Sequence, residues 1–416
     1  MVAIKEQFEV PAKMKTWALA LTGIGLLTII IGFVTHTMGA SANQHTKDIF
    51  WATMLYNSIF FMLICNASMF FICATTLAMG GWQMTFRRVP EAISTLVPIF
   101  GIIAFAIMMF IVFGMGPSTN IYPWLNKEAL EKAGNEEVLK KLGFLNPVFY
   151  LVWTILAIGL WSLLGARMRM LSREADDAAL QNQETGKSFV WRNTVTASLF
   201  IVWFALTVGS TVPWLWMMSI DANWYSTMYS WYTFASSFVS GMSLIALWVI
   251  YLKNKGYLEY TNQEHLHDLG KFMFAFSIFW TYLWFSQYML IWYGNISEET
   301  VYFKNRVQGV YKGIFFLNII INFICPILIL MKRSAKRNYT LVTFMAVLIL
   351  FGHWVDFYQM IMGSVRKESS TLGWLDFGTA AFFVGMIIYF VSKSLASKPL
   401  LAKYHPFFKE SIIHHT

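Results

Sequence analysis

The segment GHWVDFYQM, residues 352–360, places titratable side chains inside a stretch that is otherwise strongly apolar. His353 and Asp356 are three residues apart, so on a helix they lie on the same face. An imidazole and a carboxylate within hydrogen-bond reach can accept and release a proton. Ionisable groups at membrane depth are costly, and they are commonly paired or functional. The segment therefore predicts either a step in a proton path or a structural pairing.

Further titratable side chains lie near the ends of other apolar stretches and could extend such a path. An outer group, with Lys312 and Asp376, is expected to converge on His353 and Asp356. A second group lies on the opposite side, where charged residues begin two apolar stretches. Under the competing interpretation, Lys312 only neutralises an aspartate and the second group lies in interfacial water. The complete set of proton-path candidates is His353, Asp356, Tyr358, Asp376, Lys312, His267, Asp268, Lys271 and Glu91.

The elements that must position these residues are membrane-spanning helices. The chain is 57% hydrophobic and only 13% charged, which is outside the range of water-soluble domains. Its long stretches are continuously apolar rather than alternating, and about 20 helical residues cross a hydrocarbon core of about 30 Å. We predict an all-α integral membrane protein with ten transmembrane helices near residues 16–35, 50–78, 89–113, 147–169, 190–212, 226–252, 267–293, 308–331, 340–363 and 372–395.

The distribution of Lys and Arg orients this single polytopic domain, residues 1–416. Most of the 31 Lys and Arg residues fall on one side if the N-terminus is cytoplasmic, so the positive-inside rule predicts both termini inside. The net charge of +9 is then a topology signal, and no nucleic-acid partner is expected because no continuous basic stripe exists. In the outer amphipathic loop, 114–146, residues 123–142 predict one short helix. The cytoplasmic tail, 396–416, could pack on a cytoplasmic neighbour, but by default it is expected to fray.

Motifs for cofactors and for nucleotides are not found in the sequence. No GxxxxGK[ST] or GxGxxG pattern is present, so nothing predicts ATP or dinucleotide binding. Haem between helices needs histidines on facing helices, and only His353 lies deep in an apolar stretch. Cys65, Cys73 and Cys325 lie in apolar segments without CxxC spacing. We therefore expect no cofactor bound by this chain except lipids.

Three segments carry a resemblance to a known family. They are DLGKFMFAFSIFWTYLWFSQYMLIWYGNISEET (268–300), YNSIFFMLICNASMFF (56–71) and GHWVDFYQM. Together they closely resemble the F subunit of bacterial alternative complex III, a quinol:cytochrome c oxidoreductase, and the resemblance extends over essentially the entire chain. That subunit is similar to the polysulfide-reductase-type membrane subunit.

The resemblance implies an architecture and a biochemical setting. Helices two to five (about 50–212) and six to nine (about 226–363) would form two four-helix bundles, with helices one and ten peripheral. The chain would be a cofactor-free, non-redox subunit of a respiratory quinol-oxidising complex in the bacterial cytoplasmic (inner) membrane. It would support assembly and could carry protons through a half-channel. Haem c and iron–sulfur clusters would belong to partner subunits, which include the quinol-oxidising membrane subunit, with a terminal oxidase as a further possible partner.

Three alternatives remain open at the level of sequence. The chain could be purely structural, with its polar residues tying helices together. It could bind quinol directly at His353 and Asp356. It could also be a secondary transporter, whose helices are commonly broken at matching positions; Pro98 and Pro326 are the only prolines deep within spans, which is a weak signal. Whether this chain is itself enzymatic is therefore not decided by its sequence.

Overall fold

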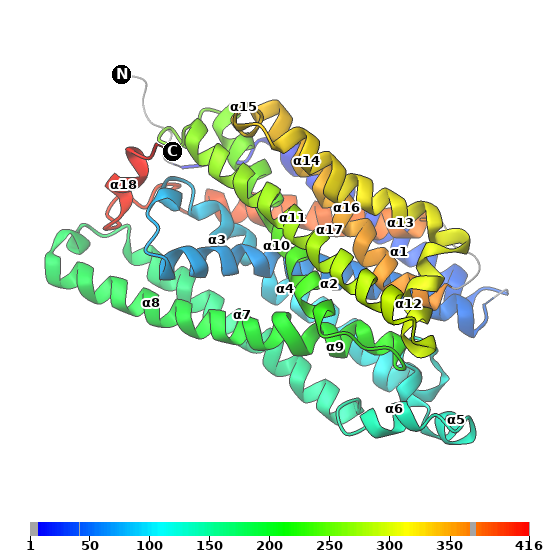
Figure 1. Ribbon diagram of the computed structural model, residues 1–416. Coiled ribbons are helices and arrows are strands. Elements are labelled where there is room, and N and C mark those ends of the chain that lie inside the picture. Colours follow the sequence, from blue (N-terminus) through cyan, green and yellow to red (C-terminus); the bar gives the residue numbers. More distant parts are fainter. Residues whose placement is uncertain (1–6, 41, 367–371, 416) are drawn as a thin grey trace.

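The computed structural model describes residues 7–40, 42–366 and 372–415, and the secondary structure of this part of the chain is helical (Figure 1). Nine of the described helices are long and apolar enough to cross a membrane. The predicted class, a helical membrane protein with many spans, is therefore confirmed. Each of the ten predicted stretches is helical, but α11 is not among the nine although it has 32 residues. Its Trp, Tyr, Ser and Gln side chains make it less apolar than the others.

The helices that correspond to the ten stretches are mostly longer than predicted. The side chains of Asn43 and Asn262 cap α2 and α11 by accepting hydrogen bonds from backbone N–H groups of the first turn. These two helices therefore begin several polar residues before the apolar stretch. The helices at the ten predicted stretches are α1 (Ala12–Phe33), α2 (Gln44–Leu77), α3 (Arg88–Ser94) with α4 (Val97–Met109), α7 (Pro147–Glu174), α8 (Gln183–Leu206), α10 (Met228–Asn254), α11 (Gln263–Gly294), α13 (Lys312–Ile319) with α14 (Cys325–Leu330), α16 (Tyr339–Val365) and α17 (Trp374–Ala396).

Two helices, α2 and α10, form the centre of the molecule and are buried along most of their length. α2 packs against α4, α8, α10 and α16, and α7 packs against α4 and α8. α10 packs against α11 and α16, while α13 and α14 lie against α16. The helices thus form two groups that meet where α2 contacts α10 and α16.

The first and the last long helices, α1 and α17, pack against each other along their lengths. Small residues permit this close approach. A Cβ atom added at Gly385 of α17 would lie 2.6 Å from the backbone nitrogen of Thr22 and 2.8 Å from the carbonyl oxygen of Ala18. A Cβ atom added at Gly25 of α1 would lie 2.4 Å from the backbone nitrogen of Phe382. The α1–α17 pair therefore depends on glycine at its contact points.

The described part of the chain begins and ends at the same end of the molecule, which we call the terminal end, and α5 and α6 lie at the opposite end (Figure 1). The described C-terminal tail is folded onto the terminal end, so the expectation that it frays is wrong. In α18 (Phe408–Ile412) the Ser411 hydroxyl donates to the Trp82 carbonyl at 2.5 Å and accepts from the Thr85 N–H at 3.2 Å. His414 contacts the carboxylate of Asp268 at 2.7 Å.

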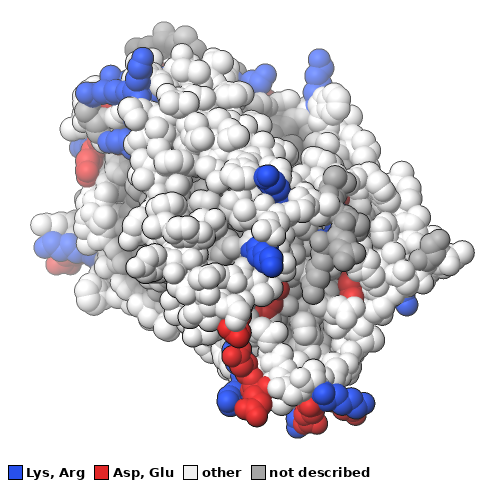
Figure 2. All heavy atoms as spheres, turned by 45° about the vertical axis from the view of Figure 1, so that its right-hand side comes forward, with Lys and Arg blue, Asp and Glu red and all other residues white. Residues whose placement is uncertain are grey.

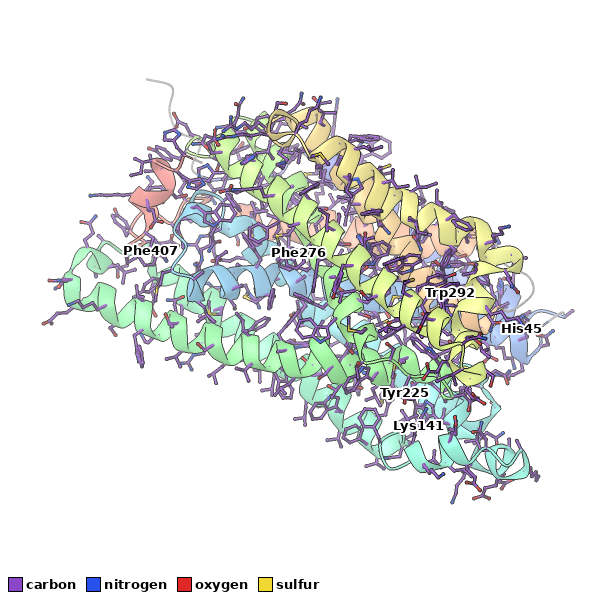
Figure 3. The ribbon with its side chains drawn as sticks, in the orientation of Figure 1. His45, Lys141, Tyr225, Phe276, Trp292 and Phe407 are labelled. Atoms are coloured by element: carbon purple, nitrogen blue, oxygen red, sulfur yellow. The ribbon has the colours of Figure 1, made fainter. Side chains whose placement is uncertain are left out.

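The loop at the opposite end contains two short helices, where the sequence predicts one. α5 (Lys127–Lys132) and α6 (Glu136–Lys141) are separated at Gly134, whose φ of +65° ends the first helix. The side chain of Asn135 then caps the second helix by accepting from the Val138 N–H. Figure 2 shows a broad expanse of surface with few charged residues, with acidic and basic side chains gathered at its lower edge. Figure 3 places Lys141 beside Tyr225 at this end and Phe407 at the terminal end.

Candidate functional site

Asp356 lies at the junction of three helices in the second group, and its side chain is 2% exposed. The carboxylate accepts hydrogen bonds from the Tyr232 hydroxyl, from the Trp280 indole N–H at 3.0 Å and from the Ser236 hydroxyl at 3.2 Å. Tyr232 and Ser236 belong to α10, and Trp280 belongs to α11. Three uncharged donors therefore hold one carboxylate of α16.

His353 completes this centre, and the predicted contact with Asp356 is confirmed. Its Nδ1 lies 2.9 Å from the Ser236 hydroxyl and 3.8 Å from a carboxylate oxygen of Asp356. The imidazole packs edge-to-face against the indole of Trp280, with the ring centroids 5.3 Å apart. The second nitrogen, Nε2, is buried and has no hydrogen-bond partner among the described residues. The imidazole thus has one nitrogen in contact with Ser236 and one that is buried without a described partner.

Aromatic and charged side chains continue from this centre toward the end that carries α5 and α6. The rings of Tyr229 and Tyr232 are 6.4 Å apart, and Tyr229 is 6.4 Å from Tyr302 of α12 (Ser297–Val307). The guanidinium of Arg306 lies 3.5 Å from the centre of the Tyr302 ring and 3.4 Å from Asp221. Burial raises the pKa of Tyr302 to about 12, partly offset by Arg306, so its hydroxyl keeps its proton at neutral pH.

Arg306 ties this outer region together through hydrogen bonds. It donates to the backbone carbonyls of Gln359 and Met360 at 3.1 and 3.0 Å, and to the Ser364 hydroxyl at 2.9 Å. Ser364 also donates to Asp221. The Asp221 side chain is 26% exposed, so this region joins the buried centre to the surface.

Polar side chains also extend from the centre toward the terminal end. Ser240 and Ser243 follow Ser236 at one-turn intervals on α10, and both are buried. On α11, Ser277 precedes Trp280 by one turn, and its hydroxyl is buried without a partner among the described residues. Buried hydroxyl groups require hydrogen-bond partners. Ser240 and Ser243 meet this requirement within α10, where they donate to the carbonyls of Ser236 and Val239.

At the terminal end, the carboxylate of Asp268 contacts the other two candidates of α11, His267 and Lys271. Lys271 lies 2.5 Å and His414 2.7 Å from its carboxylate, and His267 lies 3.7 Å away. Asp268 is largely buried, whereas Lys271 is half exposed. The predicted cluster of His267, Asp268 and Lys271 is confirmed as a set of contacts. The tail residue His414 is an addition that sequence spacing could not show, since it is 146 residues away.

Glu91 belongs to a separate ionic network. Its carboxylate pairs with Arg87 and with Arg88, each at 3.0 Å, and Arg88 also pairs with Asp176 at 2.7 Å. Two guanidinium groups hold this carboxylate in its charged form. No contact between Glu91 and Asp268 occurs within the described residues. The geometry favours a structural role for Glu91.

The predicted convergence of Lys312 and Asp376 on His353 and Asp356 is wrong. Asp376 accepts from the Tyr56 hydroxyl at 3.0 Å, from Thr53 at 3.4 Å and from the Gly373 N–H at 2.8 Å, and Arg366 lies 3.7 Å away. It therefore faces α2, because it begins α17, which packs beside α2. Lys312 is exposed at the start of α13.

Tyr358 belongs with Asp376 rather than with Asp356. Its ring packs edge-on against Tyr56 at 5.6 Å and lies 6.3 Å from Tyr311. The reason is helical geometry: Tyr358 is two positions after Asp356, which turns it to another face of α16. The proton-path candidates thus lie in four separate places: the Asp356 centre, the contacts of Asp376 with α2, the Asp268 cluster and the Glu91 network. Lys312 is exposed and belongs to none of them.

Several residues at or near the Asp356 centre were not predicted from the sequence. Trp280 and Tyr232 fall in runs of aromatic residues, which are typical of the membrane interface. Arg306 appears in the sequence as one more basic residue between two apolar stretches. A usable signal was the serine series on α10, at 230, 236, 237, 240 and 243, since repeated hydroxyls on an apolar helix indicate a packed or polar face.

Metal ions in proteins are held by clusters of His, Cys, Asp and Glu side chains. Within residues 7–40, 42–366 and 372–415, no group of three or more His, Cys, Asp or Glu side chains is arranged to bind one. The fold and the buried centre define a multi-pass helical membrane protein with a polar interior site. No family model matches the chain, and no curated protein matches its sequence significantly.

Proposed function

We propose that this chain is a cofactor-free membrane subunit of a respiratory quinol-oxidising complex of the alternative complex III type. In this proposal the Asp356 centre passes protons between the outer region at Arg306 and the Asp268 cluster. Haem c and iron–sulfur clusters belong to the partner subunits, and the complex lies in the bacterial cytoplasmic membrane. The family assignment rests on the resemblance of residues 268–300, 56–71 and 352–360.

The proton role is supported mainly by one observation. Asp356 is as buried as the apolar core side chains, yet among the described residues it has no Lys or Arg partner. Asp376 differs, because Arg366 lies 3.7 Å from its carboxylate. A fixed guanidinium keeps a carboxylate charged, whereas a neighbouring imidazole can exchange its proton. The charge of the pair formed by His353 and Asp356 can therefore change, as proton conduction requires.

The topology of ten spans, with both termini cytoplasmic, is part of the same proposal. The described part of the chain begins and ends at one end of the molecule (Figure 1), which supports an even number of crossings. Counting α11 with the nine apolar helices gives this even number. The contacts among α2, α4, α7 and α8, and among α10, α11, α13, α14 and α16, support two four-helix bundles with α1 and α17 outside them.

A purely structural role is the second candidate, and a specific contact favours it. The Asp356 carboxylate joins α16 to α10 and to α11 through Tyr232, Ser236 and Trp280. Interhelical hydrogen bonds of this kind stabilise membrane bundles. The two roles differ in what happens when the carboxylate is replaced by an amide of nearly the same shape.

The test compares Asp356→Asn with Asp376→Asn in the purified complex reconstituted into vesicles. The amide cannot take up and release a proton, so Asp356→Asn should lower the number of protons moved per electron while the complex still assembles. The control, Asp376→Asn, weakens the pairing with Arg366 and should reduce stability without changing this ratio. Unchanged proton stoichiometry in Asp356→Asn, together with reduced assembly, would assign the structural role. If the purified complex contained no quinol-oxidising subunit, the family assignment would be wrong.

A further inference from the structure

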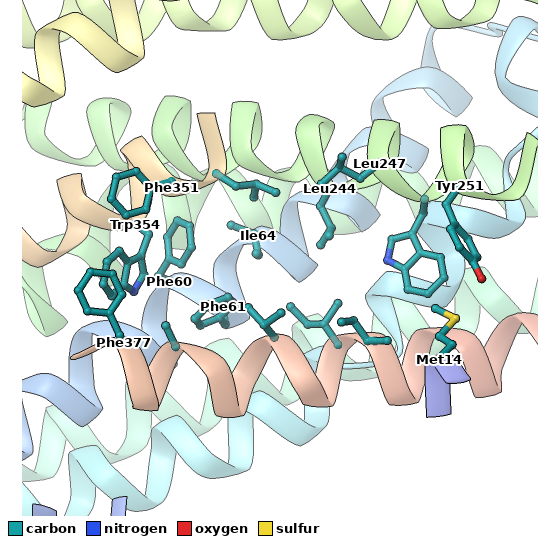
Figure 4. Close-up of a pocket in the computed structure, with 16 residues that line it drawn as sticks. Met14, Phe60, Phe61, Ile64, Leu244, Leu247, Tyr251, Phe351, Trp354 and Phe377 are labelled. Carbon is teal, nitrogen blue, oxygen red and sulfur yellow. The ribbon is translucent and has the colours of Figure 1, made fainter. Parts of the chain in front are cut away.

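A long apolar groove lies on the side of the molecule away from the Asp356 carboxylate contacts. It has a volume of about 410 Å³ and is lined by α2, α10, α16 and α17, with Met14 of α1 at one end. Figure 4 shows the lining side chains spread along α17, from Phe377, Trp354 and Phe351 to Met14 and Tyr251. Nearly all lining atoms are hydrocarbon, so water has no partners there. The natural occupant is apolar.

The dimensions of the groove restrict that occupant. On α17 the lining extends from Phe377 to Ile388, which is about 16 Å at 1.5 Å per residue. This length equals one leaflet, half of a hydrocarbon core of about 30 Å. A single acyl chain is narrow enough to enter.

The two ends of the groove differ in polarity. At the inner end the indole N–H of Trp354 is already donated to Asn57 at 2.8 Å, so no polar group is offered there. At the other end are Met14 and Tyr251, near the terminal end of the molecule. Lys13 and Lys15 are exposed on either side of Met14, and Lys255 is exposed one turn beyond Tyr251.

This rim is positively charged, even with the carboxylate of Glu9 on the segment that leads into α1. Lysine ammonium groups at the membrane surface attract anionic headgroups. We propose that the groove is a specific phospholipid site: one acyl chain fills it, and an anionic headgroup lies at Lys13, Lys15 and Lys255. The lipid belongs to the leaflet at the terminal end.

An isoprenoid quinone fits these observations less well. Its ring carries carbonyl oxygens that need hydrogen-bond donors, and the inner end of the groove has none to spare. The ring is also uncharged, so it gains little from the lysines at the rim. The anionic phospholipid satisfies both ends of the groove.

The experiment measures lipid retained by the full chain with its native partners, purified in detergent and analysed by native mass spectrometry. Ala380 and Leu247 line the groove from α17 and α10, so Ala380→Trp and, independently, Leu247→Trp fill it. The matched control is Leu199→Trp, at a position on α8 that is 56% exposed and outside the groove. Both groove variants should lower the occupancy of one tightly held phospholipid about tenfold relative to the control.

A second arm tests the headgroup. In nanodiscs with matched acyl chains, the unmodified chain should retain the anionic lipid in preference to the zwitterionic one, and the double variant Lys13→Gln, Lys15→Gln should lose this preference. Unchanged lipid retention in a folded groove variant overturns the proposal. So does a retained molecule that proves to be an isoprenoid quinone, or a segment of a partner subunit cross-linked into the groove. If one tryptophan variant fails to fold, the other still decides the outcome.

Discussion

The charge on Asp356 can be tested through the hydrogen bond from Trp280. We expect Trp280→Phe to lower the free energy of unfolding more than Trp161→Phe does. The two tryptophans form a matched pair: they are 0% and 1% exposed, and each indole N–H donates at 3.0 Å. The acceptors differ, since Trp280 donates to the Asp356 carboxylate and Trp161 donates to the Thr207 hydroxyl.

The expected magnitudes follow from the acceptors. A hydrogen bond to a charged group contributes about 1.5–3 kcal/mol, and one between neutral groups about 0.5–1.5 kcal/mol. The loss of ring volume is the same in both variants and cancels in the comparison. Trp280→Phe should therefore cost roughly 1 kcal/mol more than Trp161→Phe if the Asp356 carboxylate is charged.

The assay is reversible unfolding of the full chain in mixed detergent micelles, monitored by helical circular dichroism. The same pair of substitutions is then made in an Asp356→Asn background, where the acceptor is neutral and the excess cost of Trp280→Phe should disappear. Equal costs of the two substitutions in the unmodified background would refute the reasoning. Asp356 would then accept this hydrogen bond as a neutral group, and the premise of a charged carboxylate would be wrong.

Two further predictions concern the α1–α17 contact and the tail. Gly385→Leu should destabilise the chain by about 1–3 kcal/mol, because the new side chain overlaps the backbone of Thr22 and forces α1 away; Gly23→Ala, with nothing within 4 Å, should be neutral, and thermal unfolding measures both. Burial, with repulsion from Arg87 and Arg88, lowers the pKa of His405, so the docked tail keeps this imidazole neutral. The unfolded tail binds a proton near pH 6.5, so docking is most stable above that pH and weakens as the pH falls below it. Hydrogen-exchange protection factors of the tail should fall between pH 7.5 and 5.5, and His405→Gln should reduce that fall.

The sequence by itself determined the helices. Each of the ten apolar stretches is helical, since a continuous apolar run of this length can satisfy its backbone groups in lipid only within itself. The pairing of His353 with Asp356 also followed from spacing, because residues three apart share a helix face whatever the neighbours are. The missed break at Gly134 is local too, and glycine followed by a capping asparagine carried that signal.

Only the tertiary structure decided which groups meet across helices. The rotation of each helix about its axis depends on packing against all its neighbours, and it brings Tyr232 and Trp280 to Asp356 while Lys312 remains exposed. The contact of His414 with Asp268 joins residues far apart in the chain. Spacing along one helix fixes a face, but the partner of that face is chosen by the fit of the whole bundle.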